Sequence, residues 1–255
     1  MEFATVIVPA AAVRRKAKHQ SEMTNQLLFG EKVEIIKEKG SLWLKVRSLH
    51  DGYEGWMTNT LLHEINEEEA HHYCPYVTTC HLDTIHINQM KMHVPLGSSL
   101  PRFNEGTGSI NGTTFDFDGS FYRRNENAPG EELIKQLSFQ WLNAPYLWGG
   151  RTVLGVDCSG FVQVNFKMMG IDLPRDAWQQ AQEGRVIKKL KEAVCGDLAF
   201  FDDKDEIVHV GILLGDNRII HASGKVRIDM IDNKGIINSD TGKRTHSLRV
   251  IKRCI

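Results

Sequence analysis

The pattern of hydrophobic residues changes once along this chain, directly after a polar stretch. Before it, short runs typical of β-strands alternate with turns that contain Gly, Asn, Asp or Ser. The polar residues 123–127 lead into Pro129-Gly130, and this segment is the best domain boundary in the sequence. Beyond it, hydrophobic residues recur at helical spacing from 133 to 142, and β-type runs return later. Helices followed by antiparallel strands predict an α+β fold.

Two small all-β domains are predicted before this boundary. The first contains four β-type runs, and an acidic connector at 64–69 follows it. The second is a shorter β unit, with turns that contain Gly, between residues 75 and 122. We therefore expect domains at 1–66, 67–125 and 126–255, which a chain of 255 residues can accommodate.

Composition excludes several classes of function. The 31 Lys and Arg residues nearly balance the 32 Asp and Glu residues, so the charge does not favour a nucleic-acid partner. The longest apolar run, 6–13, contains Pro9 and is far shorter than the roughly 20 residues of a membrane span. The N-terminus does not resemble a signal peptide, because Glu2 is acidic. We expect a cytoplasmic protein, or an exported one if a leader has been removed.

One of the five cysteines has an unusual position. Their spacing contains no C-x-x-C, and a disulfide framework is not expected in a chain of this length. Asp157 lies where a helix N-cap is predicted, so Cys158 would begin a helix that ends before Gly170. The N-terminus of a helix lowers the pKa of a thiol and favours a nucleophilic thiolate. The alternative is a small buried residue at the start of a helix.

Two histidines lie on consecutive β-type runs that are expected to form a hairpin. The turn at 215–217 pairs position 211 with 221 and position 214 with 218, so His209 and His221 become diagonal neighbours on one face. A nucleophilic cysteine needs a base, and the base needs a group that fixes its tautomer. His209 can be that base and His221 the orienting group. The alternative is that both histidines have structural roles.

Five motifs, in this order, resemble those of the NlpC-type cell-wall cysteine peptidases. They are Tyr146-Leu-Trp-Gly-Gly, Val156-Asp-Cys-Ser-Gly-Phe-Val, Gly196-Asp-Leu-Ala-Phe-Phe, His209-Val-Gly-Ile and Ile220-His-Ala-Ser. The resemblance covers about residues 131–225 and implies a papain-like catalytic domain without a cofactor. It implies Cys158 as the nucleophile, His209 as the base and His221 as the third member of the triad. It also implies that the Tyr146 hydroxyl and the Cys158 backbone N–H stabilise the oxyanion.

The two β domains at the N-terminus make the chain similar to one subgroup, the YkfC-like gamma-D-glutamyl-L-diamino acid endopeptidases, also called dipeptidyl-peptidase VI. In this subgroup such domains are SH3-like. Its members cleave the bond between γ-D-glutamate and an L-diamino acid in murein peptides. The diamino acid is meso-diaminopimelate or L-lysine. The peptides have a free N-terminal L-alanine, and the enzymes release L-Ala-D-Glu. The resemblance therefore implies a murein peptide as the partner, and we expect a monomer.

The same resemblance implies a set of residues that bind substrate. They are Glu22, Tyr53, Trp148, Asp157, Ser159 and Asp176. Glu22 and Tyr53 would belong to the first SH3-like domain and read the free amine, for which a carboxylate is the physical requirement. Ala177 departs from the pattern, because a serine often stands there in relatives. Judged without the family, Asp157 is only an N-cap, Glu22 an exposed carboxylate, and Tyr53 and Trp148 packing residues.

A stretch rich in histidine and cysteine raises the alternative of a structural zinc site. Its members are His71, His72, Cys74, Cys80, His81, His86 and His93. Their spacing matches no zinc-ligand template, and the neighbours Cys80 and His81 would point to opposite faces of a strand. We expect no metal.

Two other functions stay open. One is a wall-anchored endopeptidase or amidase that acts on polymeric peptidoglycan, with the SH3-like domains as anchors. The other is a wall-binding protein with an inactive catalytic domain. Occupation of all three triad positions argues against the second.

Overall fold

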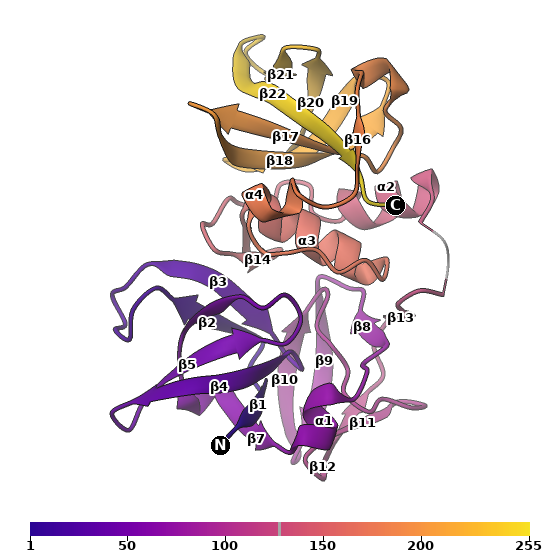
Figure 1. Cartoon of the computed structure of the whole chain (residues 1–255). Coiled ribbons are helices and arrows are strands. Elements are labelled where there is room, and N and C mark those ends of the chain that lie inside the picture. Colours follow the sequence, from indigo (N-terminus) through magenta and orange to yellow (C-terminus); the bar gives the residue numbers. More distant parts are fainter. Residues whose placement is uncertain (127–128) are drawn as a thin grey trace. The chain divides into compact units, whose positions relative to one another are not determined.

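Residues 1–126 and 129–255 are described in the computed structural model, and they divide into two units (Figure 1). Unit 1 contains Met1–Glu126 together with Trp148–Val153, and unit 2 contains the rest of the described chain. The predicted division into three domains stays a prediction; part of the polar segment at its second boundary lies outside the described residues. No helix within the described ranges has the length and apolarity that a membrane crossing requires.

Unit 1 begins with a seven-stranded sheet in the order β3-β2-β6-β5-β4-β1-β7. Its strands are β1 (Phe3–Val6), β2 (Ala10–Arg14), β3 (Met23–Leu28), β4 (Lys32–Lys39), β5 (Trp43–Ser48), β6 (Glu54–Thr58) and β7 (Leu62–Ile65), with a 3-10 turn at Asn59–Leu61. In β2, Ala11 and Val13 alternate with more exposed neighbours, as a strand with one buried face requires. They pack in a core with Val46 and Met57, and this core holds the curved sheet together.

The second β region of unit 1 has a four-stranded sheet in the order β10-β9-β12-β11 and a separate pair of β13 with β8. The strands are β8 (Tyr76–Thr78), β9 (Leu82–Ile87), β10 (Met90–Pro95), β11 (Thr107–Ile110), β12 (Thr113–Phe117) and β13 (Phe121–Arg123). The acidic connector forms the end of β7 and a short helix, α1 (Glu67–His71), which Asn66 caps. Phe29 and Phe115 pack edge to face in a core that both β regions share.

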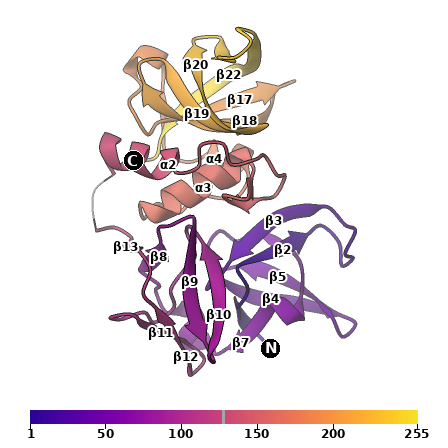
Figure 2. The same cartoon turned by 180° about the vertical axis from the view of Figure 1, so that it is seen from behind.

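Unit 2 contains a seven-stranded antiparallel sheet in the order β16-β22-β17-β18-β19-β20-β21, and a further pairing of β21 with β22 closes six of these strands into a ring. Its elements are α2 (Glu131–Phe139), β15 (Gly155–Val156), α3 (Cys158–Met168), α4 (Ala177–Gln180), β16 (Arg185–Ile187), a 3-10 turn at Leu190–Glu192, β17 (Leu198–Asp203), β18 (Glu206–Gly215), β19 (Arg218–Ser223), β20 (Lys225–Asp232), β21 (Gly235–Ile237) and β22 (Arg244–Arg253). Figure 2 shows the three helices on one side of this sheet.

Helix α3 is buried over its whole length, because it packs against β18 and β19 of the same unit. The predicted hairpin of β18 and β19 is present, and Gly211 pairs with His221 as expected. The expected pairing of position 214 with 218 is wrong, because a bulge shifts the register and Gly215 pairs with Arg218 instead. Asp216 and Asn217 both have positive φ, the geometry of a two-residue turn that matches the twist of a hairpin.

Candidate active site

The nucleophile candidate lies at the first position of α3, and the N-cap prediction for its neighbour is confirmed. The Asp157 carboxylate accepts a hydrogen bond from the Gly160 backbone N–H at 2.7 Å. Cys158 is buried, with 6% of its surface exposed. Its thiol lies against the backbone N–H of Val210, the residue that follows His209 in β18. The fold therefore brings Cys158 to the strand that carries the predicted base.

The expectation of a lowered thiol pKa at this helix terminus is wrong. Burial raises the pKa of Cys158 to about 12, and the nearby Asp157 carboxylate acts in the same direction. The Val210 N–H and the Arg175 guanidinium lower the pKa, but they do not offset the burial. At neutral pH the sulfur therefore carries its proton, so an attack by Cys158 would need a base that removes this proton.

The predicted base and its orienting group are in direct contact. His209 Nε2 and His221 Nδ1 are 2.8 Å apart, and both rings are buried. Burial lowers the pKa of His209 well below its usual value, and the neighbouring rings of His221 and His246 add to this effect. A neutral imidazole can accept a proton, so His209 is in the state that a base requires.

Beyond the two histidines lies a carboxylate that sequence reasoning missed. His221 Nε2 is 3.0 Å from Oδ2 of Asp229, which lies on the adjacent strand β20. Asp229 is buried, which favours the neutral acid, but hydrogen bonds from His221, from Arg227 and from the Ser239 backbone N–H together hold its pKa well below the usual range. Extending the predicted hairpin to the next strand would have placed this side chain beside His221.

A third histidine, from β22, was also missed. The His246 ring stacks on the His209 ring, with 4.2 Å between centroids and 24° between planes. Burial lowers the pKa of His246 to about 4, with His221 as a second cause. No local pattern in the sequence marks this residue.

The predicted oxyanion donor keeps its proton. The backbone N–H of Tyr146 donates to the Gly224 carbonyl at 2.9 Å, which fixes this residue beside the turn that follows β19. Burial raises the pKa of the Tyr146 hydroxyl, and Cys158 is the next largest cause, so the two side chains are electrostatic neighbours. A protonated hydroxyl can donate to developing negative charge.

Two of the predicted substrate-binding residues are engaged by a buried arginine. Arg175 donates to the Asp157 carboxylate at 3.0 and 2.6 Å and to the Ser159 hydroxyl at 2.8 Å. Arg175 has 1% of its surface exposed. Sequence reasoning missed it, although it directly precedes the predicted Asp176. Asp176 lies at the N-terminus of α4 and is half-buried, and its backbone N–H donates to Gln179.

The remaining predicted substrate-binding residues belong to unit 1. Trp148 Nε1 donates to the Glu22 carboxylate at 2.9 Å, so the structure brings these two together. The second carboxylate oxygen of Glu22 accepts from Arg15 at 3.2 Å. Tyr53 is half-buried in the loop before β6, where its backbone N–H donates to Asp51. A part for any of them in binding substrate stays a prediction.

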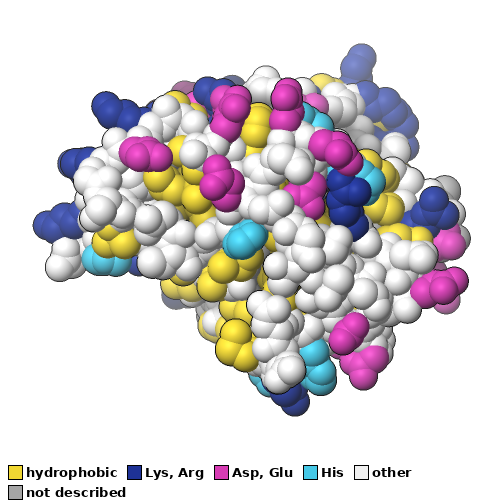
Figure 3. Space-filling view, turned by 90° about the horizontal axis from the view of Figure 1, so that it is seen from below, with side chains coloured by type: hydrophobic (Ala, Val, Ile, Leu, Met, Phe, Trp, Pro, Cys, Tyr) yellow, Lys and Arg dark blue, Asp and Glu magenta, His cyan; other side chains and the backbone are white. Residues whose placement is uncertain are grey.

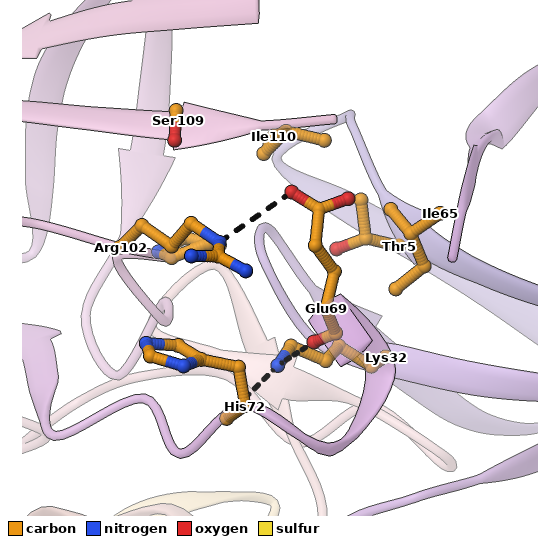
Figure 4. Close-up of a pocket in the computed structure, with 9 residues that line it drawn as sticks. Thr5, Lys32, Ile65, Glu69, His72, Arg102, Ser109 and Ile110 are labelled. Atoms are coloured by element: carbon orange, nitrogen blue, oxygen red, sulfur yellow. Dashed lines mark hydrogen bonds and ion pairs between the residues drawn. The ribbon is translucent and has the colours of Figure 1, made fainter. Parts of the chain in front are cut away.

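A pocket in unit 1 is lined by charged side chains that form hydrogen bonds and ion pairs within the protein (Figure 4). Lys32 Nζ donates to the carbonyls of Glu69 and His72 at the end of α1, at 2.5 and 2.6 Å. Arg102 forms an ion pair with Glu69 at 3.6 Å. These contacts stabilise the junction of the two β regions.

The stretch rich in histidine and cysteine does not converge on one point. Within the part of the chain that the structure describes, no group of three or more His, Cys, Asp or Glu side chains is placed to hold a metal ion. His93 contacts Thr84 of the paired strand instead.

On the face seen in Figure 3, side chains of both charge signs are interspersed, in keeping with the balanced composition.

Comparison with known proteins agrees with this geometry. The NlpC/P60 family model matches residues 143–245, and a model of the bacterial dipeptidyl-peptidase Sh3 domain matches residues 13–62. A crystal structure of an NlpC/P60 family protein from Bacillus cereus has the same fold, with a TM-score of 0.83 and 23% identity over 98% of this chain and 99% of that one. The predicted fold class, an SH3-like β region before an NlpC-type domain, is confirmed.

Two relatives cover most of the chain. A Bacillus cereus protein named Gamma-D-glutamyl-L-lysine dipeptidyl-peptidase is 30% identical over an alignment that covers 89% of this chain and 76% of that protein. A Bacillus subtilis protein of the same name is 31% identical over 214 residues, which cover 77% of this chain and 71% of that protein. Identity of this level over most of both chains, with the family model placed on the Cys158 and histidine motifs, shows that the chain belongs to the NlpC/P60 family.

Proposed function

We propose that this protein is a cysteine endopeptidase that hydrolyses the γ-D-glutamyl–L-diamino acid bond of murein peptides with a free N-terminal L-alanine and releases L-Ala-D-Glu. The observation that carries the proposal is the buried Cys158 at the start of α3, beside the strand that bears the His209–His221 pair. The relatives named Gamma-D-glutamyl-L-lysine dipeptidyl-peptidase support the choice of bond. The diamino acid is L-lysine or meso-diaminopimelate.

The first half of the reaction forms a thioester. His209 takes the thiol proton as the Cys158 sulfur attacks the γ-carbonyl carbon of the D-glutamyl residue. The oxygen of the tetrahedral intermediate accepts hydrogen bonds from the Cys158 backbone N–H and the Tyr146 hydroxyl. The carbon–nitrogen bond then breaks, and the His209 imidazolium gives its proton to the α-amine of the departing diamino acid.

The second half returns the enzyme to its starting state. His209 takes a proton from water, and the resulting hydroxide attacks the thioester carbonyl. The carbon–sulfur bond breaks, and L-Ala-D-Glu leaves with a new carboxyl group that loses its proton to the solvent. The sulfur recovers its proton from His209, so no cofactor or redox partner enters the balance.

Each unit contains residues that we propose for substrate binding. In unit 1, we propose Glu22 and Tyr53 for the free ammonium of L-alanine, because Glu22 presents a partly exposed carboxylate that Trp148 orients. In unit 2, we propose Asp176, with Asp157 and Ser159 held in place by Arg175. We also propose a monomer that acts on soluble peptides in the cytoplasm, where the reducing environment keeps cysteines such as these five as thiols.

The test is mass spectrometry of the products from L-Ala-γ-D-Glu-L-Lys and from its meso-diaminopimelate counterpart. Each peptide is also offered with an acetylated N-terminus, and Cys158→Ala is the control for nonenzymatic or contaminating cleavage. We expect L-Ala-D-Glu from the free-amine peptides with the wild type alone. Cleavage of both free and acetylated peptides would favour an endopeptidase of polymeric wall. Cleavage of neither would favour the binding protein with an inactive catalytic domain.

A further inference from the structure

A continuous chain of hydrogen bonds in unit 2 extends beyond the two histidines of the proposed triad. His209 Nε2 and His221 Nδ1 are 2.8 Å apart, and His221 Nε2 and Asp229 Oδ2 are 3.0 Å apart. All three side chains are at most 5% exposed. The chain runs across three adjacent strands, β18, β19 and β20, so the sheet itself fixes its geometry.

The last member of this chain is held as a carboxylate. Arg227 grips Asp229 with two hydrogen bonds, both of 2.8 Å, and the Ser239 backbone N–H donates a third of 2.8 Å. The other side of the Arg227 guanidinium forms an ion pair with the exposed Asp240 at 2.8 Å. These donors hold the pKa of Asp229 well below its usual range against the effect of burial. An ionised carboxylate can only accept hydrogen bonds.

This carboxylate determines where the protons of the two imidazoles lie. Because Asp229 only accepts, Nε2 of His221 must carry the hydrogen that it donates. A neutral His221 then has an unprotonated Nδ1, which accepts from the partner 2.8 Å away. Nε2 of His209 must therefore carry a hydrogen, and Nδ1 of His209 is left free to take a proton.

We propose that Asp229 is a positioning residue that sets the tautomers of His221 and His209 and so makes Nδ1 of His209 the base of the reaction. The proposal rests on the proposed function, in which His209 is that base. Asp229 also stabilises the imidazolium that His209 becomes, through the polarised His221, without accepting a proton itself. Without the carboxylate, the hydrogen bond between the two rings can reverse, so that Nδ1 of His221 donates to Nε2 of His209. Nδ1 of His209 then carries the hydrogen, and no nitrogen of this ring is free to take the thiol proton.

The test combines nuclear magnetic resonance of nitrogen-15-labelled histidines with kinetics on L-Ala-γ-D-Glu-L-Lys. In the wild type, we expect both His209 and His221 to carry hydrogen on Nε2. Asp229→Asn should populate the other tautomers and lower kcat by about 100-fold or more with little change in KM. Asp240→Asn is the matched control, since it removes a carboxylate from the far side of the same Arg227. It should leave the histidine tautomers and kcat at their wild-type values.

Several results would overturn this proposal. One is a wild-type His221 that carries its hydrogen on Nδ1, and this spectrum is decisive even if Asp229→Asn does not fold. Another is a folded Asp229→Asn protein with wild-type tautomers and unchanged kcat. Because the spectra need no substrate, a wild type with the expected tautomers that fails to cleave the peptide contradicts the proposed function and leaves the tautomer assignment supported.

Discussion

Two buried arginine–carboxylate pairs, one in each unit, have the same design and different consequences. Arg175 pairs with Asp157 at the start of α3, and Arg151, in the short strand β14 (Arg151–Thr152), pairs with Glu31 in unit 1. Both guanidiniums bind both carboxylate oxygens, and both are at most 1% exposed. Each carboxylate also accepts a backbone N–H. In both pairs, the carboxylate stabilises a local turn of the chain by accepting a backbone N–H, and the arginine neutralises the charge of that carboxylate.

The difference is what each pair holds in place. The Arg175 pair lies next to Cys158 and contributes directly to the electrostatics of its thiol. The Arg151 pair joins residues that are 120 positions apart and fastens the segment 148–153 to β3 within unit 1. Gly149 belongs to this segment, has φ of +76°, and leaves no space for a Cβ beside the Met23 carbonyl. One pair therefore affects the thiol that we propose as the nucleophile, and the other holds the chain of unit 1 together.

Removing the arginine beside the proposed nucleophile should have the largest effect. Arg175→Met leaves the Asp157 carboxylate buried without the guanidinium that neutralises it, so we expect the free energy of unfolding to fall by about 3–5 kcal/mol. It also removes a charge that lowers the thiol pKa, so alkylation of Cys158 by iodoacetamide and kcat should both fall. Urea denaturation and alkylation rates measure these effects. Arg249→Met, at an exposed pair in the same unit, is the control and should cost less than about 1 kcal/mol.

Removing the arginine of unit 1 should separate stability from chemistry. Arg151→Met leaves the Glu31 carboxylate buried without the guanidinium that neutralises it, so we expect the free energy of unfolding of unit 1 to fall by about 3–5 kcal/mol. The alkylation rate of Cys158 in the folded protein should stay at its wild-type value, because Arg151 is not among the charges that shift its pKa. A fall in alkylation as large as that of Arg175→Met would show that the two pairs do not act separately.

The sequence predicted the part of the site that local signals encode. The N-cap at Asp157 and the helix after Cys158 depend on neighbouring residues, and the hairpin of His209 and His221 depends on a turn between two alternating runs. These features arise within short segments, and the resemblance to a known family identified the same positions.

The residues that sequence reasoning missed lie beyond the predicted hairpin. Asp229 reaches the site one strand further along the chain, through the pairing of β19 with β20. His246 reaches it because β22 joins a closed ring of strands, and no short segment shows that closure. The lowered pKa expected for Cys158 was wrong because a helix terminus acts locally, whereas burial depends on everything that packs around α3. Arg175 was missed because a buried ion pair looks the same in sequence as an exposed charge.

Unlike the two ion pairs, Cys158 and His209 are both uncharged in the folded protein at neutral pH. Because folding shifts both pKa values, the free energy of unfolding should fall on both sides of neutral pH. His209, which faces His221 and His246, has its pKa lowered by folding, so its contribution is complete above about pH 6.5 and is lost as pH falls below it. Cys158 has its pKa raised, so its contribution is complete below about pH 8.5 and is lost as pH rises towards 12. Thermal unfolding at a series of pH values measures both losses of stability. Cys158→Ala should remove the part of the loss at high pH that Cys158 contributes. A loss at high pH identical to that of the wild type in this variant would contradict the assignment.

The exposed carboxylate of unit 1 should have the smallest effect on stability. Glu22 and Arg15 are both substantially exposed, so Glu22→Gln should change the free energy of unfolding by less than about 0.5 kcal/mol. If Glu22 binds the free ammonium, kcat/KM for the free-amine peptide should fall by about 10- to 100-fold, the value of a hydrogen bond to a charged group. Glu54→Gln, at another exposed pair of unit 1, is the matched control. An unchanged kcat/KM would remove Glu22 from amine binding.

The most direct test of Cys158 as the peptidase nucleophile uses a covalent substrate analogue, L-Ala-γ-D-Glu diazomethyl ketone. Its carbonyl replaces that of the scissile amide, and mass spectrometry of peptide fragments locates the adduct. We expect one adduct, on Cys158, that forms more slowly with the N-acetylated analogue and with His209→Ala. An unmodified Cys158, or labelling no faster than that of Cys74, Cys80, Cys195 and Cys254, would contradict the assignment.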